Sequence, residues 1–133
     1  MLTMTGTIGS ATAANSYAGN AFLGVNIDQA ASAATPSTVT PRGSSITVAF
    51  TNASGSTLRV ELVADSTGTT SWCANVATSP VTIPYTAFTQ QCYNTPPGPA
   101  YAKQAIEAVL LSIPGGAAAA PVNVTLVSVT ENP

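Results

Sequence analysis

The side chains best suited to chemistry are concentrated in one stretch, SWCANVATSPVTIPYTAFTQQCYN, residues 71–94. It holds the single tryptophan, both cysteines and two of the four tyrosines of the 133-residue chain. A cysteine pair can close a disulfide bond, and aromatic rings held beside it can stack on a ligand. We therefore consider this stretch both as a structural clasp and as part of a binding surface.

Cys73 and Cys92 enclose a segment with two prolines and several turn-forming residues. In a small chain with few charges, two cysteines favour a disulfide bond if the protein is exported. Closing a loop of this size would stabilise the fold by ~3 kcal/mol in the chain-entropy description. A pair of buried free thiols is the alternative. A zinc site suits the chain less well, because there is no histidine to complete a ligand set.

The chain lacks or has few of the residues that the common catalytic sites require. A serine or cysteine nucleophile activated by a histidine base is excluded, because the chain has no histidine. Glycoside hydrolysis needs two carboxyl groups across the scissile bond, and only five acidic residues are present. Glu61 faces outward in a predicted strand, but Arg59 shares that face, and we expect the two to form an ion pair. We expect no catalytic activity and keep a small polysaccharide-cleaving enzyme as a third alternative.

Sugar binding suits the remaining polar and aromatic residues. Sugar rings present weakly apolar faces beside many hydroxyl groups, so a good site offers an aromatic ring next to polar hydrogen-bonding groups. Trp72 is the best stacking surface available, and a buried core tryptophan is the alternative. Strand alternation places Trp72 and Cys73 on opposite faces. If Cys73 points into the core towards Cys92, Trp72 points outward, and we favour that arrangement.

Other residues are candidates to extend such a site. Three tyrosines could lengthen the stacking surface, namely Tyr85, Tyr93 and Tyr17. Polar side chains predicted on outward strand positions or in loops could bind sugar hydroxyls, namely Asn26, Arg59, Glu61 and Gln104. The alternative for each polar residue is that it belongs to an ordinary solvated sheet face and binds no ligand. We expect the phenylalanines, Phe22, Phe50 and Phe88, to lie in the core.

The charge content limits the classes of partner. Only three residues are basic, too few to neutralise a run of phosphates, so we expect no nucleic-acid partner. The chain also has neither a basic amphipathic stretch nor an apolar run of the roughly 20 residues that cross a bilayer, so we expect no membrane partner. A structural calcium ion is a weak alternative, with Asp28 and Asp65 as its candidate ligands.

The elements that must position these residues are predicted to be β-strands. Apolar and polar residues alternate in FLGVNIDQ, SITVAF, LRVELV and VNVTLVSV, which begin at residues 22, 45, 58 and 122. Turn-forming sequences such as NASGS, DSTG and PGG separate them. The segment AYAKQAIEAVLLSI is rich in helix formers, but its alternation favours a strand over residues 105–113, with a short helical turn before it.

About eight short strands with one dry face each predict an all-β fold, a β-sandwich of the jelly-roll type. No internal repeat and no second hydrophobic pattern divides the chain, so we expect residues 1–133 to form one domain. The N-terminal MLTMTGTIGS lacks the charged and apolar regions of a secretory signal. We therefore expect this domain to have been excised from a larger secreted protein.

The order of short motifs resembles the β-sandwich carbohydrate-binding modules of bacterial plant-cell-wall-degrading enzymes. The resemblance runs from GNAFLGVNIDQ through LRVELV, WCA, IPYTAF and QCY to AYAKQAIEAVLLSIPG and VNVTLVSV. It implies a jelly roll that docks a tethered glycoside hydrolase onto cell-wall glucan outside the cell. Cys73 and Cys92 match the disulfide positions of the family. Tyr85 and Tyr93 stand where relatives tend to carry tryptophan, which implies a smaller stacking area.

The sequence thus predicts a non-catalytic carbohydrate-binding domain for β-1,4-glucan-type polysaccharides such as cellulose-derived oligosaccharides, mixed-linkage glucan or xyloglucan. Trp72 is the predicted central stacking residue. The alternative is a structural or adhesive β-sandwich that binds a protein partner. That alternative predicts a buried Trp72 and an exposed apolar patch.

Overall fold

The computed structural model describes residues 1–12, 19–29, 36–65, 67 and 69–133. These residues form eight β-strands and one 3₁₀ turn over Tyr85–Ala87. The strands are β1 (Leu2–Ile8), β2 (Asn20–Asn26), β3 (Ser45–Asn52), β4 (Leu58–Val63), β5 (Ser71–Val76), β6 (Val81–Pro84), β7 (Ala108–Pro114) and β8 (Ala120–Asn132).

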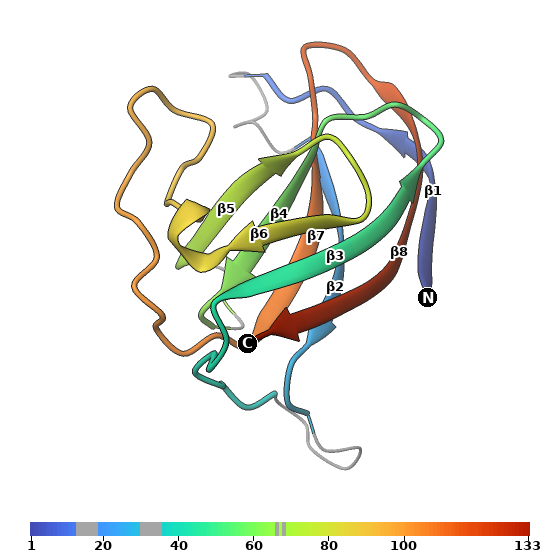
Figure 1. Cartoon of the computed structure of the whole chain (residues 1–133). Helices are drawn as coiled ribbons and strands as arrows, with labels where there is room; N and C mark the ends of the chain where they lie inside the picture. Colours follow the sequence, from blue (N-terminus) through green and yellow to red (C-terminus); the bar gives the residue numbers. More distant parts are fainter. Residues whose placement is uncertain (13–18, 30–35, 66, 68) are drawn as a thin grey trace.

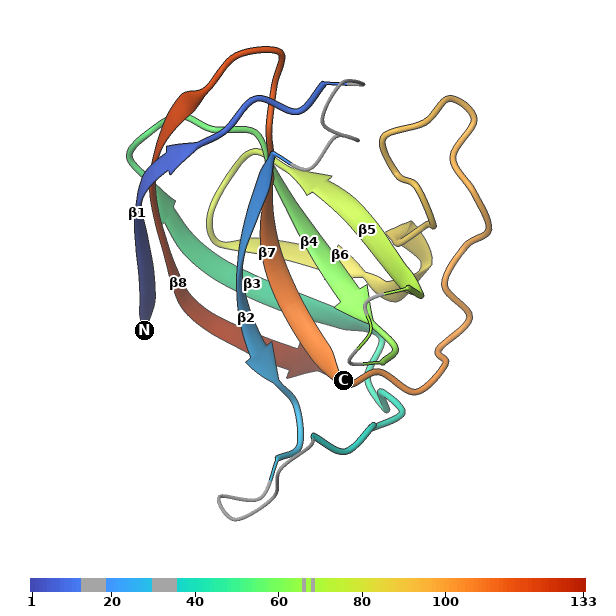
Figure 2. The same ribbon diagram turned by 180° about the vertical axis from the view of Figure 1, so that it is seen from behind.

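The strands make two four-stranded antiparallel sheets that pack face to face (Figures 1 and 2). One sheet has the order β1-β8-β3-β6 and the other has the order β2-β7-β4-β5. Chain neighbours β1 and β2 therefore lie in different sheets, as do β2 and β3, and the chain wraps around the sandwich. This strand order is that of a jelly roll, so the predicted fold class is confirmed.

The core follows the alternation of the sequence. In β3 the buried residues are Ile46, Val48 and Phe50, while Thr47 and Ala49 face outward. The same inward spacing is observed in β4 and β8, where the buried residues at alternate positions are Leu58, Val60, Leu62, Val122, Val124 and Leu126. Val63 at the end of β4 is buried as well. Phe88, in the segment after the 3₁₀ turn, is fully enclosed. The predicted core positions of Phe50 and Phe88 are confirmed.

Two predictions about these elements are wrong. Phe22 is 61% exposed, because β2 turns Leu23 and Val25 towards the core and so turns Phe22 outward. The prediction of a strand rather than a helix in this part of the chain is confirmed, but β7 begins at Ala108 instead of residue 105, and Ile106 forms only an isolated bridge to Val39. No helical turn precedes that strand, since residues 102–105 run without regular structure. No helix among the described residues has the length and apolar character required to span a membrane.

The predicted disulfide bond between Cys73 and Cys92 is confirmed, with 5.5 Å between the two Cα atoms. It ties β5 to the segment that follows the 3₁₀ turn. Backbone hydrogen bonds between Cys73 and Thr89 join the same two segments. A disulfide bond is typical of proteins in oxidising compartments and is compatible with an extracellular protein.

Candidate ligand-binding groove

Trp72 lies in the core, so the prediction that it points outward is wrong. Its side chain is 4% exposed, and its ring centroid lies 4.9 Å from that of Tyr101. Trp72 and Cys73 do occupy opposite faces of β5, as expected from strand alternation. Cys73, however, points to the outer face of the sheet, where its partner segment covers it. A tryptophan enclosed in this way offers no ring face to a sugar.

Tyr85 is also buried, so it cannot lengthen a stacking surface as predicted. It is 3% exposed and packs against Tyr101, with ring centroids 5.8 Å apart. The hydroxyl of Tyr85 donates a hydrogen bond to Oε1 of Glu131 over 3.2 Å. Burial, together with the charge of Glu131, raises the pKa of Tyr85 well above its usual value and that of Tyr101 to about 12. Both tyrosines therefore belong to the apolar interior as neutral side chains.

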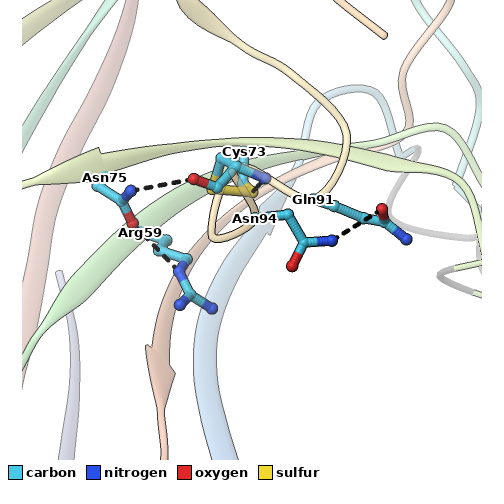
Figure 3. The surroundings of a disulfide bond; sticks show 6 residues. Arg59, Cys73, Asn75, Gln91 and Asn94 are labelled. Carbon is cyan, nitrogen blue, oxygen red and sulfur yellow. Dashed lines mark hydrogen bonds between the residues drawn. A yellow bond between two sulfur atoms is a disulfide. The ribbon is translucent and has the colours of Figure 1, made fainter. Parts of the chain in front are cut away.

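The segment held by the disulfide bond places Tyr93 over the outer face of the sheet β2-β7-β4-β5, beside Arg59. Figure 3 shows the disulfide bond with Arg59 and Asn75 next to it. Cys92 donates its backbone N–H to Sγ of Cys73 over 3.1 Å, and its carbonyl accepts a hydrogen bond from Nδ2 of Asn75 over 3.4 Å. Asn75 in turn accepts a hydrogen bond from Nε of Arg59 over 3.2 Å. The Arg59 guanidinium lies 4.8 Å from the centre of the Tyr93 ring. Tyr93 remains 59% exposed.

Strand alternation explains why Arg59 and Asn75 meet. They are direct cross-strand partners in β4 and β5, and their neighbours Leu58, Val60 and Ala74 point into the core. Both polar side chains therefore stand on the outer face, where they contact the disulfide-bonded segment. In Figure 2 that segment passes beside β5 on its way to β7.

A hollow of about 900 Å³ lies over the outer face of this sheet. Tyr93 and Asn94 of the segment line it, together with residues 11–12 and 19–20 and with residues 114–117 at and after the end of β7. Its walls carry a mixture of aromatic, charged and amide side chains, namely Tyr93, Arg59, Glu61, Asn20 and Asn94, with Ser112 and Gly115 also lining it. A second hollow of about 390 Å³ adjoins it along the same face. It shares Asn20, Glu61 and Ser112 with the first and adds Phe22, Leu110, Asp65 and Glu107. We call the two hollows together the outer groove.

The predicted ion pair between Arg59 and Glu61 is absent. Arg59 contacts Asn75 and the Tyr93 ring, and Glu61 is half-buried and has no hydrogen-bond or charge partner among the described residues. Glu61 is paired across the ladder with Leu110 on one side and Cys73 on the other. Its carboxylate oxygens are therefore available as acceptors in the groove.

Of the residues predicted to bind a ligand, the structure brings together Tyr93, Arg59 and Glu61. Asn26 lies elsewhere: its side chain donates to Gln29, and it lines a separate cavity of about 250 Å³ at one end of the sandwich, together with Tyr85 and Glu131. Gln104 is occupied locally, because its Oε1 accepts the backbone N–H of Ala102 over 2.9 Å. Tyr17 lies outside the described residues.

The calcium prediction gains no support from the described part of the chain. No group of three or more acidic or cysteine side chains is placed there to hold a metal ion. Asp28 is exposed at the end of β2. Asp65 accepts hydrogen bonds from the backbone N–H and the hydroxyl of Thr67, as in a local turn.

Comparison of the chain with protein-family models, with curated proteins and with solved structures gives no match. Sequence reasoning missed Asn20, Phe22, Asn94, Glu107 and Ser112 as groove residues. For Phe22 and Ser112 the signal was present, since both alternate with inward-facing apolar neighbours. For Asn94 there was none, because its place depends on how an irregular segment folds back on the sheet.

Proposed function

We propose that this protein is a non-catalytic carbohydrate-binding module that binds β-1,4-linked glucan chains in the outer groove. The observation that carries the proposal is the exposed Tyr93 ring beside Arg59 and Glu61 in a hollow of about 900 Å³. An aromatic face next to hydrogen-bonding groups suits a sugar, which has apolar C–H faces and a polar edge. Tyr93 takes the stacking role that the sequence assigned to Trp72.

The polar groups of the groove match a polymer rich in hydroxyl groups. Arg59 supplies N–H donors, Glu61 supplies acceptors, and the amides of Asn20 and Asn94 supply both. The contact between Arg59 and Tyr93 holds both side chains before a ligand arrives, which lowers the entropy lost on binding. A chain crossing from the first hollow to the second would next meet the exposed Phe22 ring.

In the organism, such a module would act outside the cell as part of a secreted bacterial enzyme. Tethering a glycoside hydrolase to a glucan-binding domain raises the effective concentration of the enzyme at its polymer. The disulfide bond between Cys73 and Cys92 is in keeping with that compartment.

The first test is the affinity of Tyr93→Ala for glucan, measured by calorimetry with cellohexaose and by native affinity gels with mixed-linkage glucan and xyloglucan. We expect a loss of about 2 kcal/mol of binding free energy, because removing a central stacking residue typically has an effect of this size. Val127→Ala, which truncates an exposed apolar side chain of the other sheet, is the control and should bind normally. Unchanged affinity of Tyr93→Ala would show that the groove is not the glucan site.

A second candidate function is adhesion to a protein partner. The burial of Trp72 favours it, because that hypothesis predicted a buried tryptophan. It also predicted a continuous apolar patch, whereas the outer groove mixes aromatic with charged and amide side chains. Absence of binding to every polysaccharide of a broad panel, with the protein folded, would favour adhesion over glucan binding.

A further inference from the structure

The two hollows of the outer groove differ in charge. Arg59 lines only the larger hollow, where it accompanies Glu61. The smaller hollow is lined by Glu61, Asp65 and Glu107 and by no basic side chain. Three of the five acidic residues of the chain thus line this one hollow, whose volume is about 390 Å³. Their fields add, so a positive charge is favoured at this end of the groove and disfavoured beside Arg59.

Two of these carboxylates have no side-chain partner in the described part of the chain. Glu61 and Glu107 are half-buried, and neither forms a hydrogen bond or an ion pair with its side chain among the described residues. Glu107 is held in place through its backbone, whose N–H donates to the carbonyl of Val63 over 2.7 Å. The carboxylates are therefore positioned by the sheet and are free to accept hydrogen bonds from a ligand.

Ser112 independently indicates a polar ligand at the same place. It is 8% exposed, stands on the outer face between Phe22 and Arg59 in the strand register, and lines both hollows. Its hydroxyl has no hydrogen-bond partner among the described residues, yet it is not sealed off, because no unpartnered polar atom there is fully enclosed. A hydroxyl this deeply placed normally has a partner. A ligand in the groove would supply one.

We propose that the smaller hollow binds a protonated amino sugar, so that the ligand of the module is a β-1,4-linked glycan chain containing glucosamine units. This inference rests on the proposed function and specifies its ligand. The ammonium group would lie between Glu61 and Glu107, and a neighbouring sugar hydroxyl would bond to Ser112. The apolar face of the same ring would lie against Phe22 and Leu110, which line that hollow.

Other cations suit the site less well. A bare metal ion needs several ligands converging on one point, and no such group is found within the described residues. A basic peptide would satisfy the carboxylates but would not need the stacking surface of Tyr93 in the adjoining hollow. An amino-glycan chain uses both hollows at once, with uncharged rings beside Tyr93 and Arg59.

The test compares the affinities of glucosamine hexamer, N-acetylglucosamine hexamer and cellohexaose by calorimetry at low salt. We expect glucosamine hexamer to bind about fivefold more tightly than cellohexaose, the gain typical of a solvent-accessible ion pair. Salt, or a pH at which the sugar amine is neutral, should remove that preference. Glu107→Gln and Glu61→Gln should remove it as well. The matched control is Glu131→Gln, which removes a carboxylate outside the groove and should preserve it.

The outcomes separate this inference from the proposed function. Equal or tighter binding of cellohexaose, lost in Tyr93→Ala, would overturn the amino-sugar assignment and leave glucan binding standing. Binding of none of the three oligosaccharides would overturn both. Binding of hexalysine as tight as that of glucosamine hexamer would show that the hollow recognises charge alone, and would also overturn the amino-sugar assignment.

Discussion

Tyr93 and Trp72 lie in different environments: the Tyr93 ring is exposed in the outer groove, and the Trp72 ring is buried in the core. Tyr93 is exposed, yet it is fixed by the Arg59 guanidinium at 4.8 Å and by the disulfide bond of its neighbour Cys92. Trp72 packs against Tyr101, stands opposite Leu62 in the neighbouring strand and is 4% exposed, so it belongs to the core. At the scale of the residue, Tyr93 is therefore the proposed stacking residue of the binding site, and Trp72 is a residue of the core.

This assignment predicts that Trp72→Ala lowers the free energy of unfolding. Removing a large buried ring deletes apolar contacts and leaves a cavity, which typically costs about 3–5 kcal/mol. Denaturation with urea, followed by circular dichroism, measures the loss. The matched comparison is Phe22→Ala, which truncates an exposed ring and should change stability much less. Equal stability of Trp72→Ala and the unmodified protein would contradict the buried position.

At the scale of the element, the segment between the 3₁₀ turn and β7 turns a plain sheet face into a groove. It is fixed to β5 by the disulfide bond and by the paired backbone hydrogen bonds of Cys73 and Thr89. Further along, Gln90 donates its backbone N–H to the carbonyl of Pro99 and accepts that of Gly98. These bonds close the segment on itself and hold Tyr93 at the rim of the groove.

Loss of the disulfide bond should therefore affect both stability and binding. The double variant Cys73→Ser/Cys92→Ser removes the covalent bond that closes the loop between residues 73 and 92. In the chain-entropy description, this should lower the free energy of unfolding by about 3 kcal/mol. Glucan affinity should fall at the same time, because the Tyr93 ring would no longer be fixed over Arg59. Measuring binding under conditions in which the variant remains folded separates the two effects. Full glucan affinity in the folded variant would show that the disulfide bond is not needed to position Tyr93 for binding.

At the scale of the whole molecule, the two outer faces differ in character. The face of the sheet β1-β8-β3-β6 carries hydroxyl groups that pair with one another, such as Thr47 with Thr82 over 2.8 Å and Thr3 with Thr125 over 2.9 Å. The face of the sheet β2-β7-β4-β5 carries the outer groove, where the Glu61 carboxylate and the Ser112 hydroxyl have no hydrogen-bond partner among the residues that the structure describes. Ligand binding is thus expected on one face of the sandwich.

Much of this architecture could be predicted from the sequence, because burial follows strand alternation closely in β3, β4 and β8. Alternation fixes only which neighbours lie on opposite faces, and it does not say which face is inside. For Trp72 and Cys73, a disulfide bond in the core predicts the wrong side, because Cys73 points to the outer face of the sheet and Trp72 lies in the core. The meeting of Tyr93 with Arg59 could not be predicted, because it depends on an irregular segment folding back across β5.

Mapping backbone amide chemical shifts during titration with cellohexaose, and in parallel with glucosamine hexamer, tests most directly whether the outer groove binds the glycan. We expect the largest shifts to cluster at Arg59, Glu61, Tyr93 and Ser112, on β4, β7 and the segment carrying the disulfide bond. The strands β1, β3 and β8 should shift little. Shifts concentrated on those three strands, or saturating binding that leaves the groove residues unchanged, would contradict this expectation.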